Sequence, residues 1–415
     1  MRALVAIPIA AILPACWMSH AIGSDPAGAD SGTDAPDAWV DPGADPDAAG
    51  DPDLPDPSCT LEPRGARQLT SGGHAASAPR VYWDGDEVGV VFMEGGGDMW
   101  HPQVSMIRVM PDLSDQSALV VVGEESHGWG EPAWTGDSLG ICWHTDPGMV
   151  GRTAFRMHSA SGAILGSRVD LDFSGEACLG LLHREGSFLS SWRSFPDPGS
   201  SGTATMIAVL GPGGSTISGP VEIARGEYPG PTPTLLGVPG GYLVVWARSG
   251  IVTGRWLDPS GAVLHESSVE VAAATYCSAG MRDGLIGLAC TIAGGDASSV
   301  AFLEVGDGME ILAGPVTLSS YEPETGGPDI VGLPDGWAVS WHQGDWTDQR
   351  AYLAHVDEGG DRRQPDLVLR EGRNSGYGGP VLMARGDDLY AGISAYPEPD
   401  AGLEQAYLMR FECVP

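Results

Sequence analysis

Residues 328–341 read PDIVGLPDGWAVSW, and residues 233–246 read PTLLGVPGGYLVVW. Each stretch holds a proline, an alternating apolar run, a glycine-bearing turn and a closing tryptophan at the same spacing. Alternation on both sides of a tight turn is typical of two short strands joined as a β-hairpin. The chain therefore contains at least two copies of one structural unit.

The position of the closing tryptophan, Trp341 in the first stretch, recurs at intervals of about 50 residues. Its equivalents are Phe92, Trp143, Trp192, Trp246, Cys290 and Ile393. An inner strand precedes each of these positions, and a third apolar strand with a glycine-bearing turn and a short fourth strand follow it. A unit of four short strands cannot bury both faces alone, whereas a ring of such units can. The sequence predicts an all-β fold, a seven-bladed β-propeller with four-stranded blades in which these tryptophans pack the blades together.

The last repeat predicts how the ring closes. Its third strand contains Phe411 and ends close to the end of the chain, so its fourth strand is missing there. The segment 66–72, ARQLTSG, precedes the first blade and belongs to no other repeat, so we expect it to complete the last blade. Cys59 and Cys413 then lie where the other blades have a covalent turn, and a disulfide between them would replace that turn.

The chain has seven cysteines, and an odd number in an exported protein marks one cysteine with a separate role. Without Cys16, the other six predict three disulfides and an oxidising compartment. Besides the pair that closes the ring, we expect one disulfide within a hairpin of blade five and one between blades two and three. These two pairs are Cys277–Cys290 and Cys142–Cys178. The cysteine and histidine spacings do not match a zinc site, so we expect no metal and no cofactor.

The N-terminal residues 1–15 combine one early arginine with an apolar run too short to span a bilayer, which predicts a signal peptide. Leu13 to Cys16, LPAC, resembles the lipobox of bacterial lipoproteins. That resemblance implies lipidation of Cys16 and attachment to the membrane through the lipid anchor only. Trp17 follows the cysteine, and an aspartate there would have implied inner-membrane retention, so the outer membrane is favoured. The alternative is cleavage after Ala21, which would release a secreted protein.

Residues 16–58 form a segment rich in aspartate, proline, alanine and glycine. Between residues 24 and 58 there are ten aspartates, seven prolines and no lysine or arginine. Such a composition cannot bury enough apolar surface to fold, so we expect a disordered tether that leads to the propeller at 59–415. The alternative, calcium binding by the aspartates, lacks the ligand spacing of a known calcium loop.

The charge of the chain excludes several functions. There are 55 acidic residues against 21 basic ones, all of them arginine, for a net charge of −34. Nucleic acid is therefore not an expected partner, because phosphate binding needs a basic face. The absence of lysine excludes Schiff-base chemistry and a phosphate loop with its lysine.

The frame of the repeat is a closing tryptophan, the pattern h-x-h-x-x-h-D-x-x-G and a short final strand. It resembles the repeat propellers of secreted bacterial lipoproteins, over residues 59–415 for the repeat and 1–58 for export and tether. The resemblance implies a propeller displayed at the cell envelope and implies no particular activity.

A ligand site is expected on one rim, formed by the loops from second to third strands and from fourth strands to the next blade. Aromatic rings with polar neighbours suit glycan or peptide binding. The candidate rim residues are Glu94, Asp98, Trp100, His101, His144, Arg193, His342, Asp345 and Trp346. Among them, His144, Arg193 and His342 directly follow the repeat tryptophan on three blades. The alternatives are that these residues only cap the blades, or that His144, Asp146 and His342 converge on a metal.

These features predict a non-enzymatic, monomeric envelope lipoprotein whose propeller binds a glycan, peptide or protein partner. The alternative is a secreted polysaccharide hydrolase or lyase that uses rim carboxylates such as Glu94 and Asp98 as acid and base. A third interpretation is a structural surface protein without a ligand.

Overall fold

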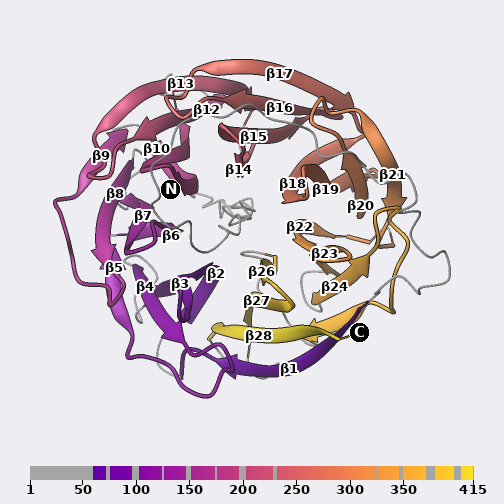
Figure 1. The fold of residues 1–415 in the computed structure, drawn as a ribbon, viewed down its shortest axis with the longest axis horizontal. Helices are drawn as coiled ribbons and strands as arrows, with labels where there is room; N and C mark the ends of the chain where they lie inside the picture. Colours follow the sequence, from indigo (N-terminus) through magenta and orange to yellow (C-terminus); the bar gives the residue numbers. More distant parts are fainter. Residues whose placement is uncertain are drawn as a thin grey trace, which may run out of the picture.

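The computed structural model describes residues 59–71, 75–95, 102–123, 126–145, 151–172, 175–195, 202–227, 231–320, 322–323, 325–344, 349–370, 379–396 and 403–414. Within these ranges the chain forms 28 strands, which pair into seven four-stranded sheets. The sheets stand around a common axis as the blades of a wheel (Figure 1). The seven-bladed β-propeller predicted from the repeat is confirmed.

Each blade except the last is built from four consecutive strands. Blades one to three contain β2 (Ala75–Trp83), β3 (Val88–Gly95), β4 (Gln103–Val109), β5 (Val120–Gly123), β6 (Ser126–Trp134), β7 (Ser138–Thr145), β8 (Arg152–Ser159), β9 (Val169–Asp172), β10 (Gly175–Arg184), β11 (Ser187–Ser194), β12 (Gly202–Leu210) and β13 (Thr216–Glu227). Blades four to six contain β14 (Thr234–Val238), β15 (Gly241–Arg248), β16 (Ile251–Leu257), β17 (Val263–Glu270), β18 (Ala274–Arg282), β19 (Leu285–Ala293), β20 (Ser298–Val305), β21 (Ile311–Thr317), β22 (Gly326–Leu333), β23 (Gly336–Gln343), β24 (Arg350–Val356) and β25 (Leu367–Arg370).

Blade seven is completed from the other end of the described chain. Its sheet has the order β1–β28–β27–β26 and contains β1 (Thr60–Gln68), β26 (Val381–Arg385), β27 (Asp388–Ala395) and β28 (Gln405–Val414). The closing strand begins earlier than the predicted segment 66–72, because its ladder reaches Thr60 opposite Val414 across an irregularity at Pro63. An outermost strand tolerates that proline, since one of its edges has no ladder partner.

All three predicted disulfides are present, and they connect Cys59 with Cys413, Cys142 with Cys178, and Cys277 with Cys290. The first lies between the end of β28 and the start of β1, with the Cα atoms 5.2 Å apart. It therefore stands in blade seven where the other blades have the turn from third to fourth strand.

In other blades, this turn packs against the preceding blade. A Cβ atom at Gly162 of blade two would lie 2.7 Å from Val120 of blade one, and one at Gly360 of blade six would lie 2.9 Å from Val316 of blade five. Both glycines have φ near 85°, a conformation that other residues rarely adopt. The glycine in the repeat therefore supplies both the turn and the close contact between blades.

The repeat tryptophans lie between blades, as predicted. Trp143 of β7 packs with Val104 and Val122 of blade one, and Trp341 of β23 packs with Phe302 of blade five. Trp192 of β11 also donates a hydrogen bond from Nε1 to Asp172 Oδ2 on the outer strand of blade two, at 2.8 Å. Burying side chains of this size contributes a large share of the stability of each interface.

Buried polar groups add specific contacts between neighbouring inner strands. Arg80 of blade one and Glu131 of blade two are both buried and form an ion pair with Nε and Oε1 2.8 Å apart. Asp329 of blade six accepts hydrogen bonds from Ser278 of blade five and from the backbone N–H of Leu382 of blade seven.

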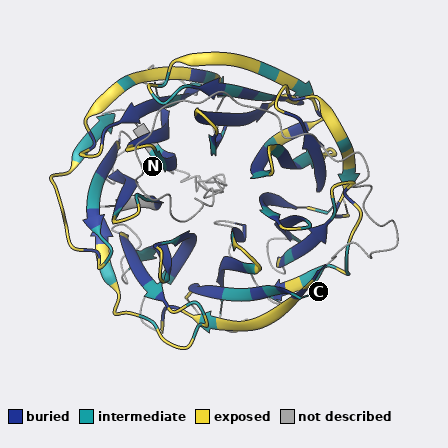
Figure 2. Cartoon of the chain, viewed as in Figure 1, coloured by how far each residue is buried: buried dark blue, intermediate teal, exposed yellow. Residues whose placement is uncertain are grey.

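Inner strands are buried, whereas the outermost strands such as β17 are exposed at most positions (Figure 2).

The connections divide the propeller into two faces. We call the lower face the one with the turns from first to second and from third to fourth strands, and the upper face the opposite one. Because β1 starts beside the end of β28, Cys59 lies on the lower face. Within the described ranges, no helix has the length and apolar character needed to cross a bilayer.

Candidate functional site

The predicted ligand rim corresponds to the upper face. Four of its candidate residues are described: Glu94, His144, Arg193 and His342. The remaining five lie outside the described residues; they are Asp98, Trp100, His101, Asp345 and Trp346.

His144, Arg193 and His342 occupy the ends of second strands β7, β11 and β23 that point to the upper face. Their exposed fractions are only 5%, 1% and 4%. The reason is strand alternation: the tryptophan before each of them faces the preceding blade, so the next side chain turns toward the following blade. These three side chains therefore lie within blade interfaces, beneath the rim surface, on blades two, three and six.

His144 is held in a space that a glycine provides. A Cβ atom at Gly151, just before β8 across the ladder, would lie 1.6 Å from His144 Nε2. The imidazole therefore lies directly over the Cα of this glycine. Any larger residue at position 151 must displace the ring.

Glu94 is the one predicted rim carboxylate within the described residues. It lies near the end of β3, is half-buried, and its Oε2 accepts a hydrogen bond from Ser105 Oγ at 2.8 Å. This contact orients the carboxylate along the strand pair β3–β4. General acid–base hydrolysis of a glycoside needs a second carboxyl group, and the predicted partner Asp98 lies outside the described residues.

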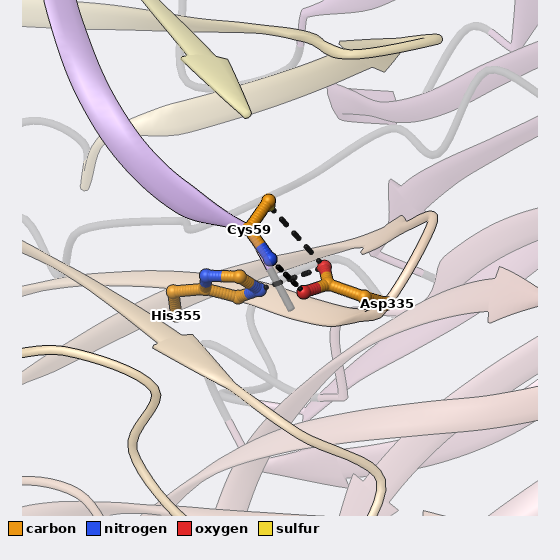
Figure 3. Close-up of side chains that lie close together, drawn as sticks. All are labelled: Cys59, Asp335 and His355. Atoms are coloured by element: carbon orange, nitrogen blue, oxygen red, sulfur yellow. Dashed lines mark hydrogen bonds and ion pairs between the residues drawn. The ribbon is translucent and has the colours of Figure 1, made fainter. Parts of the chain in front are cut away.

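A polar cluster that the sequence did not predict lies on the lower face, where Cys59, Asp335 and His355 meet (Figure 3). Asp335 lies in the turn between β22 and β23, and its Oδ2 accepts the backbone N–H of Cys59 at 2.7 Å. His355 of β24 donates from Nε2 to Asp335 Oδ1 at 3.1 Å. We call these three residues with Cys413 the clasp cluster.

The clasp cluster attaches blade seven to blade six. Beside it, the side chain of Gln364 accepts from the N–H of Leu61 at 2.7 Å and donates to its carbonyl oxygen at 3.2 Å. Both contacts come from blade six and engage the backbone of β1. The closing strand is therefore fixed by its own ladder, by the disulfide and by side chains of the neighbouring blade.

His355 is buried, and this burial lowers its pKa, although the Asp335 carboxylate acts in the opposite direction. The neutral ring donates through Nε2, so the bare nitrogen is Nδ1. In the disulfide, Cys59 has no thiolate, which is the form that binds metals. In this oxidised state the cluster therefore has a structural role.

A hollow of about 490 Å³ opens beside the clasp cluster. The lining includes both cysteines of the disulfide, Asp335, and the hairpin residue Asp387 of blade seven. The sequence interpretation assigned the Pro334-Asp335-Gly336 segment only to turn formation. Sequence reasoning missed that an aspartate in the turn between the first and second strands of a blade can reach the next blade. Asp335 of blade six does so at the point where blade seven closes the ring.

No family model matches the chain, and no curated protein matches its sequence. Solved structures resemble it only in outline. An acylaminoacyl peptidase from Pyrococcus horikoshii has a TM-score of 0.47 and 10% identity, covering 82% of this chain and 52% of its own. A phage phi92 endosialidase has a TM-score of 0.45 and 10% identity, covering 85% and 69%. An aldose sugar dehydrogenase from Streptomyces coelicolor, in its PQQ-bound form, has a TM-score of 0.39 and 13% identity, covering 68% and 93%.

The chain spans about half the length of the peptidase it resembles. At these identities and TM-scores, the likenesses concern the β-propeller architecture and carry no argument about function.

Proposed function

We propose that the protein is a lipid-anchored β-propeller of the bacterial cell envelope that acts as a non-enzymatic binding module. Its anchor is Cys16, its tether is 16–58, and its ligand rim is the upper face. The partner is an envelope glycan, peptide or protein.

The observation that carries this proposal is the position of Cys59 on the lower face. A tether that joins the propeller there is attached on the face opposite the rim, so the attachment leaves the upper face open to a partner. Residues 16–58 reach at most roughly 140–155 Å when fully extended. The rim loops would thus be presented well outside the surface to which the lipid is attached.

Binding is favoured over catalysis by the state of the described rim residues. His144, Arg193 and His342 are buried between blades, and Glu94 is engaged by Ser105. Such side chains support the shape of a binding surface and are poorly placed to exchange protons with a substrate. The hydrolase alternative therefore depends on loop residues such as Asp98.

The experiment is a panel of envelope glycans and peptides, tested for both binding and turnover. The variants Trp100→Ala and Trp346→Ala remove the two rim tryptophans. A matched control is Trp83→Ala on the lower face, where the ring lies under the guanidinium of Arg385 at 3.5 Å. Loss of binding in the rim variants alone supports the proposal, whereas turnover of any glycan replaces it with the hydrolase.

The anchor has an independent test. Cys16→Ser should move the protein from the membrane fraction to the soluble fraction, and the mass of the mature N-terminus should show acylation at Cys16. An unmodified N-terminus that starts after Ala21 would instead identify a secreted protein. Separation of inner and outer membranes then decides the location.

A further inference from the structure

We propose that the clasp cluster is a redox-gated metal site: once the Cys59–Cys413 disulfide is reduced, both sulfurs join Asp335 and His355 to bind Zn²⁺ or a similar divalent cation. Two cysteines, a histidine and a carboxylate are a donor set that zinc accepts. The site is separate from the upper-face rim and does not depend on the proposed function.

The geometry of the oxidised cluster already approaches that of a tetrahedral site. Zinc–ligand bonds of about 2.0–2.3 Å place neighbouring ligand atoms roughly 3.3–3.8 Å apart. Asp335 Oδ1 lies 3.5 Å from Cys59 Sγ, 3.1 Å from His355 Nε2 and 3.9 Å from Cys413 Sγ. The ligand atoms of Cys59, Asp335 and His355 already lie within 4.8 Å of one another. The two sulfurs, which are bonded to each other in the disulfide, must separate, and Cys413 Sγ must move into this group for all four residues to bind one cation.

The carboxylate of Asp335 can hold the backbone of Cys59 and bind a cation at the same time, because its two oxygens face different partners. Its Oδ2 accepts the N–H of Cys59, while its Oδ1 faces the side chain of Cys59 and the imidazole (Figure 3). The backbone contact to the closing strand can therefore persist while Oδ1 binds the cation. This hydrogen bond also orients the carboxylate, as outer contacts do in known metal sites.

The chemistry requires a dithiol reductant. Two electrons and two protons convert the disulfide to two thiols, and the dithiol becomes its own disulfide. The cation then replaces the proton on each thiol, so binding releases two protons and forms two metal–thiolate bonds. His355 binds through the lone pair of its neutral ring and moves its remaining proton to Nδ1.

The closing strand has contacts that keep the sulfurs near each other after reduction. The ladder of β1 and β28 pairs Thr60 with Val414 and continues to Gln68 opposite Tyr407. Leu61 is buried in the blade-seven core and is also held by Gln364. Reduction therefore opens one covalent bond in a strand that remains paired on its ladder side.

This disulfide is also the least buried of the three. Cys59 and Cys413 are 7% and 8% exposed, whereas the other four described cysteines are fully buried. Both cysteines are among the residues that line the hollow of about 490 Å³, which is the side from which a reductant and an ion would approach. Asp357 and Asp387 on its walls favour entry of a cation. The walls also carry Arg363 and the ion pair of Arg282 with Glu358 at 3.0 Å, so the acidic residues outnumber the basic ones by a small margin.

The test uses the full chain, reduced with dithiothreitol, freed of reductant under nitrogen and titrated with Co²⁺ and then Zn²⁺. We expect the reduced protein to show sulfur-to-cobalt charge-transfer absorption that Zn²⁺ abolishes, and the oxidised protein to show none. His355→Ala should weaken affinity by more than the roughly 10–100-fold that loss of an outer contact costs. The control Cys277→Ser/Cys290→Ser should bind as the parent protein does.

Blocking the thiols of the reduced parent protein with iodoacetamide must abolish the signal, a check that does not depend on whether a variant folds. The proposal is wrong if the reduced protein lacks the sulfur-to-cobalt band. It is equally wrong if Cys59→Ser/Cys413→Ser, or the alkylated protein, binds the cation as tightly as the reduced parent.

Discussion

The backbone N–H of Cys59 donates to Asp335 Oδ2 at 2.7 Å, which joins two residues 276 positions apart in the sequence. This bond connects the residue directly before the closing strand to the first hairpin of the neighbouring blade six. Ring closure therefore involves two blades, because side chains of blade six accept hydrogen bonds from the backbone at the start of the closing strand in blade seven.

Asp335→Ala should therefore destabilise the propeller. The change leaves the buried donors of Cys59 and His355 without their acceptor, and each such loss costs about 1–3 kcal/mol. We expect the free energy of unfolding in urea to fall by about 2–4 kcal/mol with little change in the slope. The control is Asp387→Ala in the corresponding hairpin of blade seven, and equal losses in both variants would contradict the assignment.

Arg80→Met should strongly lower the free energy of unfolding. The guanidinium forms an ion pair with Glu131, and both side chains are buried. Removing one partner of a buried pair costs about 3–5 kcal/mol, because the other charge stays buried. The double variant Arg80→Met/Glu131→Gln should recover much of this loss in thermal or urea unfolding; a double variant no more stable than the single one argues against the pair.

His158 should make stability depend on pH. Burial lowers its pKa, the hydrogen bond that Nδ1 donates to the carbonyl of Gly162 at 3.1 Å opposes this, and Arg156 lowers the pKa further. Among the described residues, its Nε2 is buried and has no hydrogen-bond partner, so a second proton is unfavourable there. The unfolded chain takes up this proton near pH 6.5 and the folded protein only at lower pH.

Because the unfolded state binds more protons in that window, stability due to His158 is fully present above about pH 6.5 and is lost as the pH falls. His158→Asn retains a donor for Gly162 and removes the titration. Unfolding free energies at pH 7.5 and pH 5.5 should therefore differ less in the variant than in the parent protein. Equal differences would show that His158 does not contribute.

Gly151→Ala should disturb the blade two interface through His144. The new methyl group would meet the imidazole, and the ring must leave its position. Overpacking of this kind costs about 1–3 kcal/mol. Gly166→Ala is the matched control, since a Cβ there meets no atom within 4 Å. A thermal shift confined to Gly151→Ala supports the contact, and equal shifts would oppose it.

The strand repeat was readable because each blade repeats the same alternation, turn and tryptophan. The disulfide pairs followed from the blade positions of their cysteines. The start of β1 was harder to predict, because Pro63 and Gly65 interrupt the alternation of the sequence although the ladder with β28 continues. The register between β1 and β28, which are far apart in the sequence, depends on how the two strands pack together, and neither sequence segment shows this by itself.

The candidate site was less predictable than the fold. His144, Arg193 and His342 were predicted as residues of the rim loops, whereas they lie within second strands and are buried. Their burial depends on which blade each side chain faces, and a single repeat does not show this. Asp335 looked like an ordinary turn residue, because its partners Cys59 and His355 come from segments 276 and 20 residues away. Local pattern identifies turns, while contacts between blades decide which turn residues acquire a role.

The Cys59–Cys413 bond also sets how the molecule responds to mechanical load. A pull applied through residue 58 reaches the covalent link before it reaches any hydrogen bond of β1. The force then passes into β28, which is clamped between β1 and β27. An outer strand separates most easily when its ladder hydrogen bonds break one after another from its end. The disulfide prevents this at the Cys59 end of β1.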